Sequence, residues 1–163
     1  MNAVELDHVS KWFDRREGGP LHVLDTVDIA IPQHAIVAIL GASGCGKSTL
    51  LNMIAGLVEP DQGAVLLNGI PSHAFRDWRA MTYMFQEDRL LPWRTAAQNV
   101  AFGLEAGRMG RAERARRVDA TLRLVGLEAF RDAYPRELSG GMRSRVALAR
   151  SLVTEPKILL PLA

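Results

Sequence analysis

Residues 41–48 combine glycines, a lysine and a serine in a spacing suited to phosphate binding. They read Gly-Ala-Ser-Gly-Cys-Gly-Lys-Ser, which fits the pattern Gly-x-x-x-x-Gly-Lys-Ser of a phosphate-binding loop. Glycine adopts backbone angles that are closed to other residues, so successive N–H groups of such a loop can point at one anion. Lys47 would reach the β- and γ-phosphates of a nucleoside triphosphate, and the Ser48 hydroxyl would hold Mg²⁺.

The flanking residues supply the elements that must position this loop. The apolar run 36–40 predicts a buried strand directly before it, and the apolar residues of 50–54 predict a helix that begins near Lys47. The N-terminal end of that helix adds positive potential. This context disfavours a chance glycine-rich turn, although kinases, GTPases and ATPases share the loop. The expected nucleotide contacts are Gly41, Ser43, Gly44, Cys45, Gly46, Lys47, Ser48 and Thr49.

A second anion-binding pattern lies at 138–150. Ser139 is placed to cap a helix, and two glycines follow it before apolar residues recur with helical spacing. A hydroxyl, exposed glycine amides and a helix N-terminus together can hold an anion. An ordinary capped helix is the alternative interpretation of this segment alone.

Together the two motifs resemble the ATP-binding-cassette (ABC) transporter family, whose signature is Leu-Ser-Gly-Gly-Gln or a close variant. The matching residues here are Leu138, Ser139, Gly140, Gly141 and Met142. Gln86, after an apolar stretch, is similar to the family's Q-loop glutamine, which implies a role in catalysis and, with Ser48, at the metal. Phe13 is similar to the aromatic residue that stacks on adenine. Trp12 is a competing candidate, and a core position for Phe13 is the other alternative.

The resemblance implies an α/β fold: a P-loop NTPase core sheet, an antiparallel β subdomain and a helical subdomain that carries the signature. Residues 1–85 would form the β subdomain and P-loop core. Residues 86–150 would hold the Q-loop and the helical subdomain, and residues 151–163 would begin the Walker B strand.

Residues 87–100 resemble more narrowly the ATPase subunits of nitrate, sulfonate, taurine and bicarbonate uptake systems. The resemblance implies ATP and Mg²⁺ as cofactors and a membrane-spanning permease subunit docked near the Q-loop. It also implies a second ATPase subunit facing the signature in trans, and a periplasmic solute-binding protein in the same system. Trp93, beside Leu90 and Leu91, suits such docking because aromatic residues are favoured interface anchors. Packing of Trp93 inside the helical subdomain is the alternative.

The last residues depart from the family pattern. Residues 155–160 begin the expected strand, but Leu162 and Ala163 stand where the family has Asp and Glu. The resemblance thus implies that the C-terminal part of the core is missing, with an unpaired sheet edge. Neither side chain can hold a metal's water shell or accept a proton, and Pro161 lacks an N–H for a central ladder. We expect slow or absent hydrolysis by this polypeptide, and a non-catalytic remnant from a frameshift or pseudogene is the alternative.

Composition narrows the class further. The chain is 48% hydrophobic and 23% charged with a net charge of +2, values typical of a globular protein and too weakly basic to favour nucleic acid. Residues 1–163 contain no window of about 18 apolar residues, so we expect a cytoplasmic protein that reaches the membrane's inner face through a partner. These features disfavour a cassette protein acting on DNA or the ribosome. A small-molecule kinase would leave the signature segment unexplained.

Patterning also predicts elements outside the motifs. Val27, Ile29 and Ile31 alternate as a half-buried strand, and residues 64–67 predict another that ends at the turn signal Asn68-Gly69. Residues 111–125 predict a helix whose arginines form a solvated face.

Overall fold

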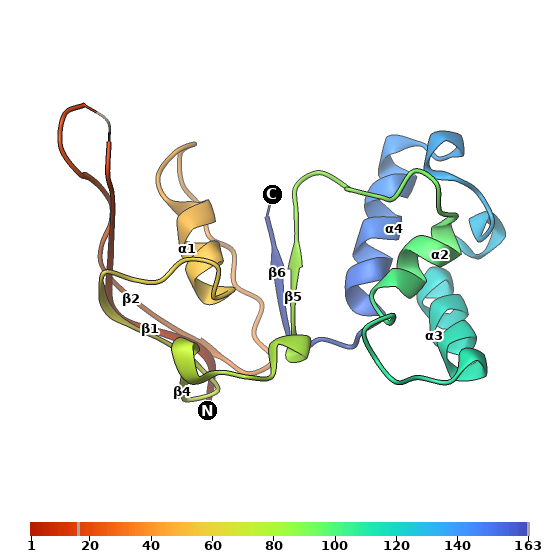
Figure 1. The fold of residues 1–163 in the computed structure, drawn as a ribbon, viewed down its shortest axis with the longest axis horizontal. Helices are drawn as coiled ribbons and strands as arrows, with labels where there is room; N and C mark the ends of the chain where they lie inside the picture. The colour runs from red at the N-terminus through yellow and green to blue at the C-terminus, as the bar shows by residue number, and fades with distance from the viewer. Residues whose placement is uncertain (16, 163) are drawn as a thin grey trace. The chain divides into compact units, whose positions relative to one another are not determined.

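The computed structural model describes residues 1–15 and 17–162. The chain is mixed α/β and divides into two compact units, Met1–Asp77 and Trp78–Ala163, each of which is described by itself. Figure 1 labels the main elements. In chain order the strands and α-helices are β1 (Asn2–Phe13), β2 (Leu21–Pro32), α1 (Lys47–Ile54), β3 (Gln62–Leu67), β4 (Ile70–Pro71), β5 (Met81–Met84), α2 (Ala96–Phe102), α3 (Arg111–Leu124), α4 (Gly140–Leu152) and β6 (Ile158–Pro161).

The first unit is built on an antiparallel sheet with the strand order β2-β1-β3-β4. The predicted strand at Val27, Ile29 and Ile31 is confirmed within β2, where these three residues are half-buried and their neighbours exposed. Such alternation is typical of a strand with one face against a core. The helix predicted to begin near Lys47 is confirmed as α1, which contacts β3 and buries Leu50, Met53 and Ile54.

The predicted turn at Asn68-Gly69 is also confirmed. It joins β3 to β4, with Leu67 paired to Ile70 across it. Asn68 has φ +51° and Gly69 φ +78°. These are the positive values that a two-residue hairpin turn needs at both central positions, and Asn-Gly reaches them at low cost.

The prediction of a buried strand at 36–40 is wrong. These residues have no regular structure, and Ile36 and Leu40 are 101% and 90% exposed. Figure 1 draws this stretch between β2 and α1 without an arrow. A parallel strand is buried only when strands flank it and helices cover it. Among the described residues, β1–β4 pair with one another and β5 pairs with β6, so no ladder partner remains for this run.

In the second unit, β5 and β6 form a parallel pair from Met81 opposite Ile158 to Met84 opposite Pro161. The three helices α2, α3 and α4 pack around a continuous apolar core. Its buried members are Ala96, Ala97, Val100, Leu104, Val118, Leu122, Leu127, Leu138, Val146, Ala149 and Val153. No helix within residues 1–15 and 17–162 is long and apolar enough to cross a bilayer.

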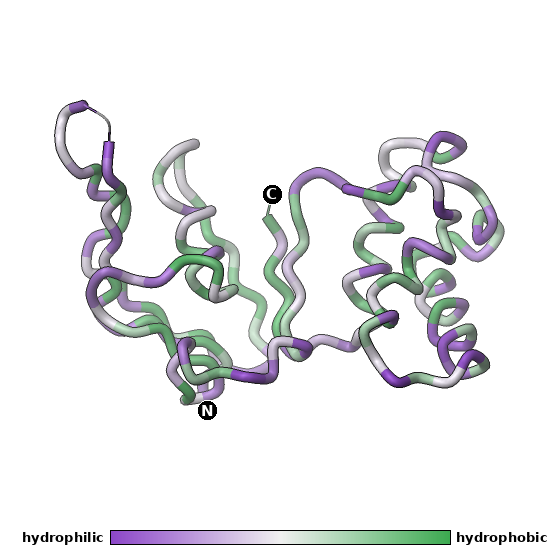
Figure 2. Tube along the Cα trace, in the orientation of Figure 1, coloured by the Kyte–Doolittle hydropathy of each residue, from purple (hydrophilic) through white to green (hydrophobic). Residues whose placement is uncertain are grey.

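The helix predicted at 111–125 is confirmed as α3, which ends one residue earlier at Leu124. Hydrophilic positions dominate this helix in Figure 2. Val118 and Leu122 form its buried stripe, and three of its arginines, Arg116, Arg117 and Arg123, form ion pairs with glutamates. Arg111, Arg116 and Arg123 are exposed, as the charge pattern predicts, whereas Arg114 is half-buried and its Nε has no hydrogen-bond partner among the described residues.

Candidate functional site

The glycine loop of the first unit turns sharply into α1. Gly44 has φ +81° and Gly46 φ +97°, in a region that side chains with a β-carbon rarely occupy. Gly46 is the N-cap of α1 and supplies no side-chain hydrogen bond. The first-turn N–H groups of α1 therefore have no capping side chain and are available to an anion.

Gly46 also lies tightly against β2. A β-carbon on this residue would be 2.9 Å from Leu24 Cδ2 and 3.0 Å from the carbonyl oxygen of Val23. At Gly44, by contrast, nothing lies within 4 Å of an added β-carbon. Glycine at position 46 is thus required both by the backbone angle and by the close approach to a neighbouring strand.

The ammonium group of Lys47 lies inside the loop. It donates hydrogen bonds to the carbonyl oxygens of Gly41 (2.7 Å) and Ala42 (2.8 Å) and is 3.7 Å from Cys45 Sγ. The loop thereby holds a positive charge beside the open N-terminus of α1. Ser48 and Thr49 follow on the first turn of α1, where Ser48 is exposed and Thr49 half-buried.

Phe13 ends β1 and is 39% exposed, with the Lys11 ammonium 5.4 Å from its ring centroid. The competing candidate, Trp12, stacks on His22 at 4.4 Å with an interplanar angle of 6°. One face of Trp12 is therefore covered by a neighbour. Lys11 pairs with Leu24, the residue that Gly46 approaches, so the end of β1 and the start of α1 meet the same part of β2.

Asp61 anchors this end of β1. Its carboxylate accepts hydrogen bonds from the Trp12 N–H (2.7 Å) and from Lys11 Nζ (2.9 Å). The Trp12 N–H, and after it the Lys11 ammonium, hold the pKa of Asp61 below its ordinary value. The strand segment next to Phe13 is thus tied to the loop that follows α1.

The signature segment of the second unit has the capped geometry that the sequence predicts. Ser139 is the N-cap of α4, and its hydroxyl accepts a hydrogen bond from the Met142 N–H at 3.3 Å. Leu138 is buried in the helical core, whereas Ser139, Gly140 and Gly141 are exposed. The hydroxyl and the glycine amides therefore lie at an accessible helix N-terminus.

Gln86 is exposed two residues beyond the end of β5. Beside it, the Arg89 guanidinium lies over the Phe85 ring at 4.1 Å from the centroid. Gln86 and the signature belong to the second unit and the glycine loop belongs to the first. The structure therefore describes each set within its own unit.

Sequence reasoning missed the residues that hold the segment after β5. Arg143 Nε donates to Asp88 Oδ2 at 3.0 Å, and the Arg150 guanidinium donates to the carbonyl oxygens of Asp88 and Arg89, both at 2.8 Å. Burial lowers the pKa of Arg150, and the Asp88 carboxylate opposes that shift. The available signal was the spacing of Arg143 and Arg150, which puts both on one face of α4.

Asn99 is a second missed residue. It is fully buried in α2, and its amide nitrogen donates to the carbonyl oxygens of Leu91, Arg94 and Thr95. Its amide oxygen accepts from the Leu91 N–H at 2.8 Å. One side chain thus forms hydrogen bonds with the backbone groups of the turn that leads into α2. The N-terminus of α2 is capped by the reciprocal hydrogen bonds of Thr95 and Gln98.

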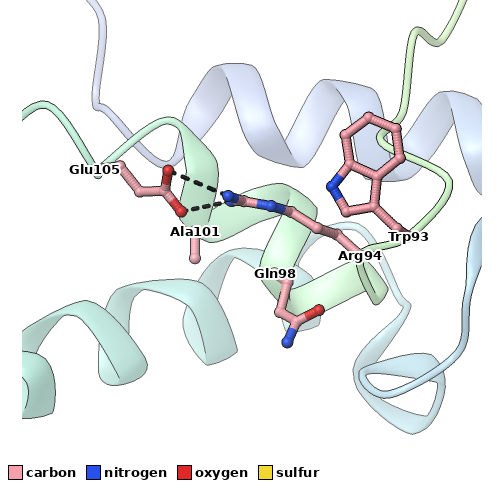
Figure 3. Close-up of a pocket in the computed structure, with 5 residues that line it drawn as sticks. All are labelled: Trp93, Arg94, Gln98, Ala101 and Glu105. Atoms are coloured by element: carbon pink, nitrogen blue, oxygen red, sulfur yellow. Dashed lines mark hydrogen bonds and ion pairs between the residues drawn. The ribbon is translucent and has the colours of Figure 1, made fainter.

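A shallow surface pocket of about 390 Å³ lies beside that turn, lined by Trp93, Arg94, Gln98, Ala101 and Glu105. Figure 3 shows the Trp93 indole at its rim and the Arg94–Glu105 ion pair across it. Trp93 is 71% exposed, so the alternative that it packs inside the helical core is wrong, and docking against a partner stays a prediction.

The sequence profile of the ABC transporter family matches residues 24–161. The taurine import ATP-binding protein TauB of Rhizobium johnstonii is 48% identical over 157 residues, which cover 96% of this chain and 59% of that protein. The nitrate import ATP-binding protein NrtC of Synechococcus elongatus is 43% identical over 159 residues, 96% of this chain and 24% of that protein.

Among solved structures, the dimeric post-hydrolysis state of the ATP-binding cassette MJ0796 bound to ADP and Pi has a TM-score of 0.83 and 34% identity. The match covers 97% of this chain and 72% of that one. The chain thus spans 59% of the length of the taurine protein and 24% of that of the nitrate protein. The predicted fold class is confirmed by the match to a cassette structure and by the mixed α/β elements.

Proposed function

The chain belongs to the ABC transporter family, and on that premise we propose that it is the ATP-binding subunit of an uptake transporter. The observation that carries the proposal is the loop at 41–46, which holds the Lys47 ammonium beside an uncapped helix N-terminus. A polyphosphate needs this combination of amide donors and a mobile cation.

The nucleotide-binding roles follow from the chemistry of each group. The N–H groups of residues 43–46 cradle the β-phosphate, and Lys47 exchanges its carbonyl partners for phosphate oxygens. Ser48 would hold Mg²⁺, which would neutralise phosphate charge, and the metal role of Gln86 stays a prediction from the family resemblance. Thr49 contacts the α-phosphate, and Phe13 offers adenine an exposed ring face. When adenine stacks on the Phe13 ring, the Lys11 ammonium either moves away from the ring or lies on the ring face opposite the adenine.

Ser139, Gly140 and Gly141 act on the nucleotide of a second ATPase subunit. Their exposure at the N-terminus of α4 supports this role, because the hydroxyl and the glycine amides are open to a γ-phosphate presented from outside. Two subunits would then enclose two nucleotides between them. The dimeric cassette structure at 34% identity supports the same arrangement.

The pocket beside Trp93 receives a membrane-spanning permease subunit. Its exposed indole supplies apolar contact area, and the Arg94–Glu105 pair supplies polar contacts at the rim. Nitrate is an oxyanion, and taurine carries an oxyanion group. The relatives named for the import of these two solutes therefore support a small oxyanionic solute. A periplasmic solute-binding protein would select the solute, since the ATPase subunit does not contact it.

A second candidate function is nucleotide binding without hydrolysis. It is favoured by Leu162, whose apolar side chain follows β6 and whose N–H donates to the Met84 carbonyl oxygen at 2.9 Å. The family has a metal-supporting Asp at this position. Ala163, where the family has the Glu that polarises water, lies outside the described residues. The 163-residue polypeptide would then bind ATP and turn it over slowly or not at all.

A co-purification experiment tests the transporter role. Tagged chain is mixed with detergent-solubilised permease of a taurine importer, with and without Mg·ATP, and the retained permease is quantified. We expect retention by the wild-type chain and a loss of at least about fivefold for Trp93→Ala, the size typical of an interface hot spot. The matched control, Trp78→Ala, removes an indole outside the pocket. Equal retention by all three proteins, or by none, contradicts the permease assignment.

A further inference from the structure

The segment between β5 and α2 is attached to α4 by two arginines. Arg143 and Arg150 lie two helical turns apart on one face of α4, and both bind Asp88. Arg150 also donates to the carbonyl oxygen of Arg89. Arg143 is bound through the Asp88 carboxylate, and Arg150 through backbone carbonyl oxygens. We call this set the Asp88–Arg143–Arg150 clamp.

One end of the clamp meets the signature directly. While Arg143 Nε binds Asp88, its Nη1 donates to the carbonyl oxygen of Leu138 at 3.0 Å. Leu138 immediately precedes Ser139, and the Arg143 N–H donates to the Ser139 carbonyl oxygen at 2.9 Å. A single guanidinium therefore joins the carboxylate of Asp88 to the backbone that orients Ser139.

The other end of the clamp holds a strained backbone. Arg89 has φ +44°, a left-handed value that strains a non-glycine residue. Its carbonyl oxygen is fixed by Arg150, and its own guanidinium is drawn over Phe85. Phe85 and Arg89 thereby bracket Gln86, so the conformation around Gln86 depends on the contact with α4.

We propose that the Asp88–Arg143–Arg150 clamp is a positioning device that fixes Ser139, Gly140 and Gly141 relative to Gln86. A displacement of the segment around Gln86 then reaches the signature through Asp88 and Arg143. This inference rests on the proposed function, in which Gln86 and the signature act on nucleotide in one cycle. Asp88 and Arg143 are positioning residues, because neither is placed against the nucleotide.

Hydrogen exchange of the full chain, followed by mass spectrometry, tests the clamp without nucleotide. The reporting amides are those of Met142 and Arg143, which are bonded to the Ser139 hydroxyl and carbonyl oxygens. Asp88→Asn should speed their exchange by roughly threefold to tenfold, the range expected when a half-buried hydrogen bond loses its charge assistance. Asp88→Glu retains the carboxylate and should restore slow exchange, whereas a purely structural perturbation would not be rescued in this way.

The matched control is Asp119→Asn, which breaks the exposed ion pair with Arg131 in the same unit and should leave Met142 and Arg143 unchanged. Faster exchange confined to residues 85–91 overturns the proposal, because the effect of the substitution then does not reach the amides at the start of α4. Equal acceleration throughout α2 and α3 also overturns it, because the change is then a general loss of stability. Failure of the wild-type chain to bind ATP would instead contradict the proposed function, and the exchange result would still decide whether the clamp exists.

Discussion

The Lys47 ammonium lies 2.7 Å from the carbonyl oxygen of Gly41, so the cation of the glycine loop is held by the loop itself. A second hydrogen bond to Ala42 keeps it there. A phosphate must form stronger hydrogen bonds with Lys47 than these two carbonyl oxygens do. Its oxygens are charged, and hydrogen bonds between two charged groups are stronger than those to a neutral carbonyl. The loop therefore places its positive charge beside the open end of α1.

Gly46→Ala should be more damaging than Gly44→Ala. Both residues have positive φ, but only at position 46 would a β-carbon meet Leu24 and the Val23 carbonyl oxygen. We expect Gly44→Ala to lower the free energy of unfolding by about 1 kcal/mol and Gly46→Ala by about 2–4 kcal/mol. Urea denaturation of the two variants measures the difference. Equal losses would show that the contact with β2 carries no cost.

Asn99→Ala should destabilise the second unit strongly. The substitution leaves the Leu91 N–H without its partner at a fully buried position and removes one hydrogen bond from each of the carbonyl oxygens of Leu91, Arg94 and Thr95. We expect a loss of about 2–4 kcal/mol in the free energy of unfolding. Gln98→Ala is the matched control, because it removes an exposed amide from the same helix and should cost about 1 kcal/mol or less through its cap. A smaller loss for Asn99→Ala than for Gln98→Ala would contradict the described turn.

Asp61→Asn should change how stability depends on pH in acid. The bonds from Trp12 and Lys11 hold the folded-state pKa of Asp61 below its ordinary value of 3.8. A depressed carboxylate pKa contributes stability that is present above the unfolded pKa and is lost as pH falls through the folded pKa. The variant should therefore have a lower melting temperature than wild type at neutral pH, and the difference between the two melting temperatures should disappear below about pH 4.

Thermal melts of wild type, Asp61→Asn and Glu59→Gln between about pH 7 and pH 3 provide the measurement. Glu59→Gln removes the same charge from the same loop and controls for net charge. A constant gap between wild type and Asp61→Asn at every pH would mean that the ionised carboxylate is not what stabilises the end of β1.

Local sequence signals predicted the elements whose stability is local. The Asn68-Gly69 turn, the helix from Arg111 and the Ser139 cap each depend on backbone preferences or spacing within a few residues, and all three are present. The run 36–40 failed as a strand because a buried strand depends on partners elsewhere in the chain. The hydrophobic residues of this run indicate that it could be buried, but they do not show which strands and helices would bury it.

The positions of the candidate site residues were predictable only where a motif carries them. The glycine loop and the signature have fixed spacing, so their residues could be named in advance. The bond between Asp88 and Arg143 joins residues 55 positions apart, and no periodicity links a loop to a helix over that distance. Asn99 likewise looked like one polar residue in a helical stretch, and only its burial reveals that it holds the preceding turn.

The most direct test of the account is a titration of the 163-residue chain with Mg·ATP by isothermal calorimetry, repeated with Lys47→Ala and with Lys157→Ala as a matched control. The account predicts saturable binding by the wild-type chain and by Lys157→Ala, and binding weaker by at least about tenfold for Lys47→Ala, since a charge-assisted contact to phosphate is lost. Absence of binding by the wild-type chain, or equal binding by Lys47→Ala, would contradict the assignment of the loop at 41–46 as a nucleotide site.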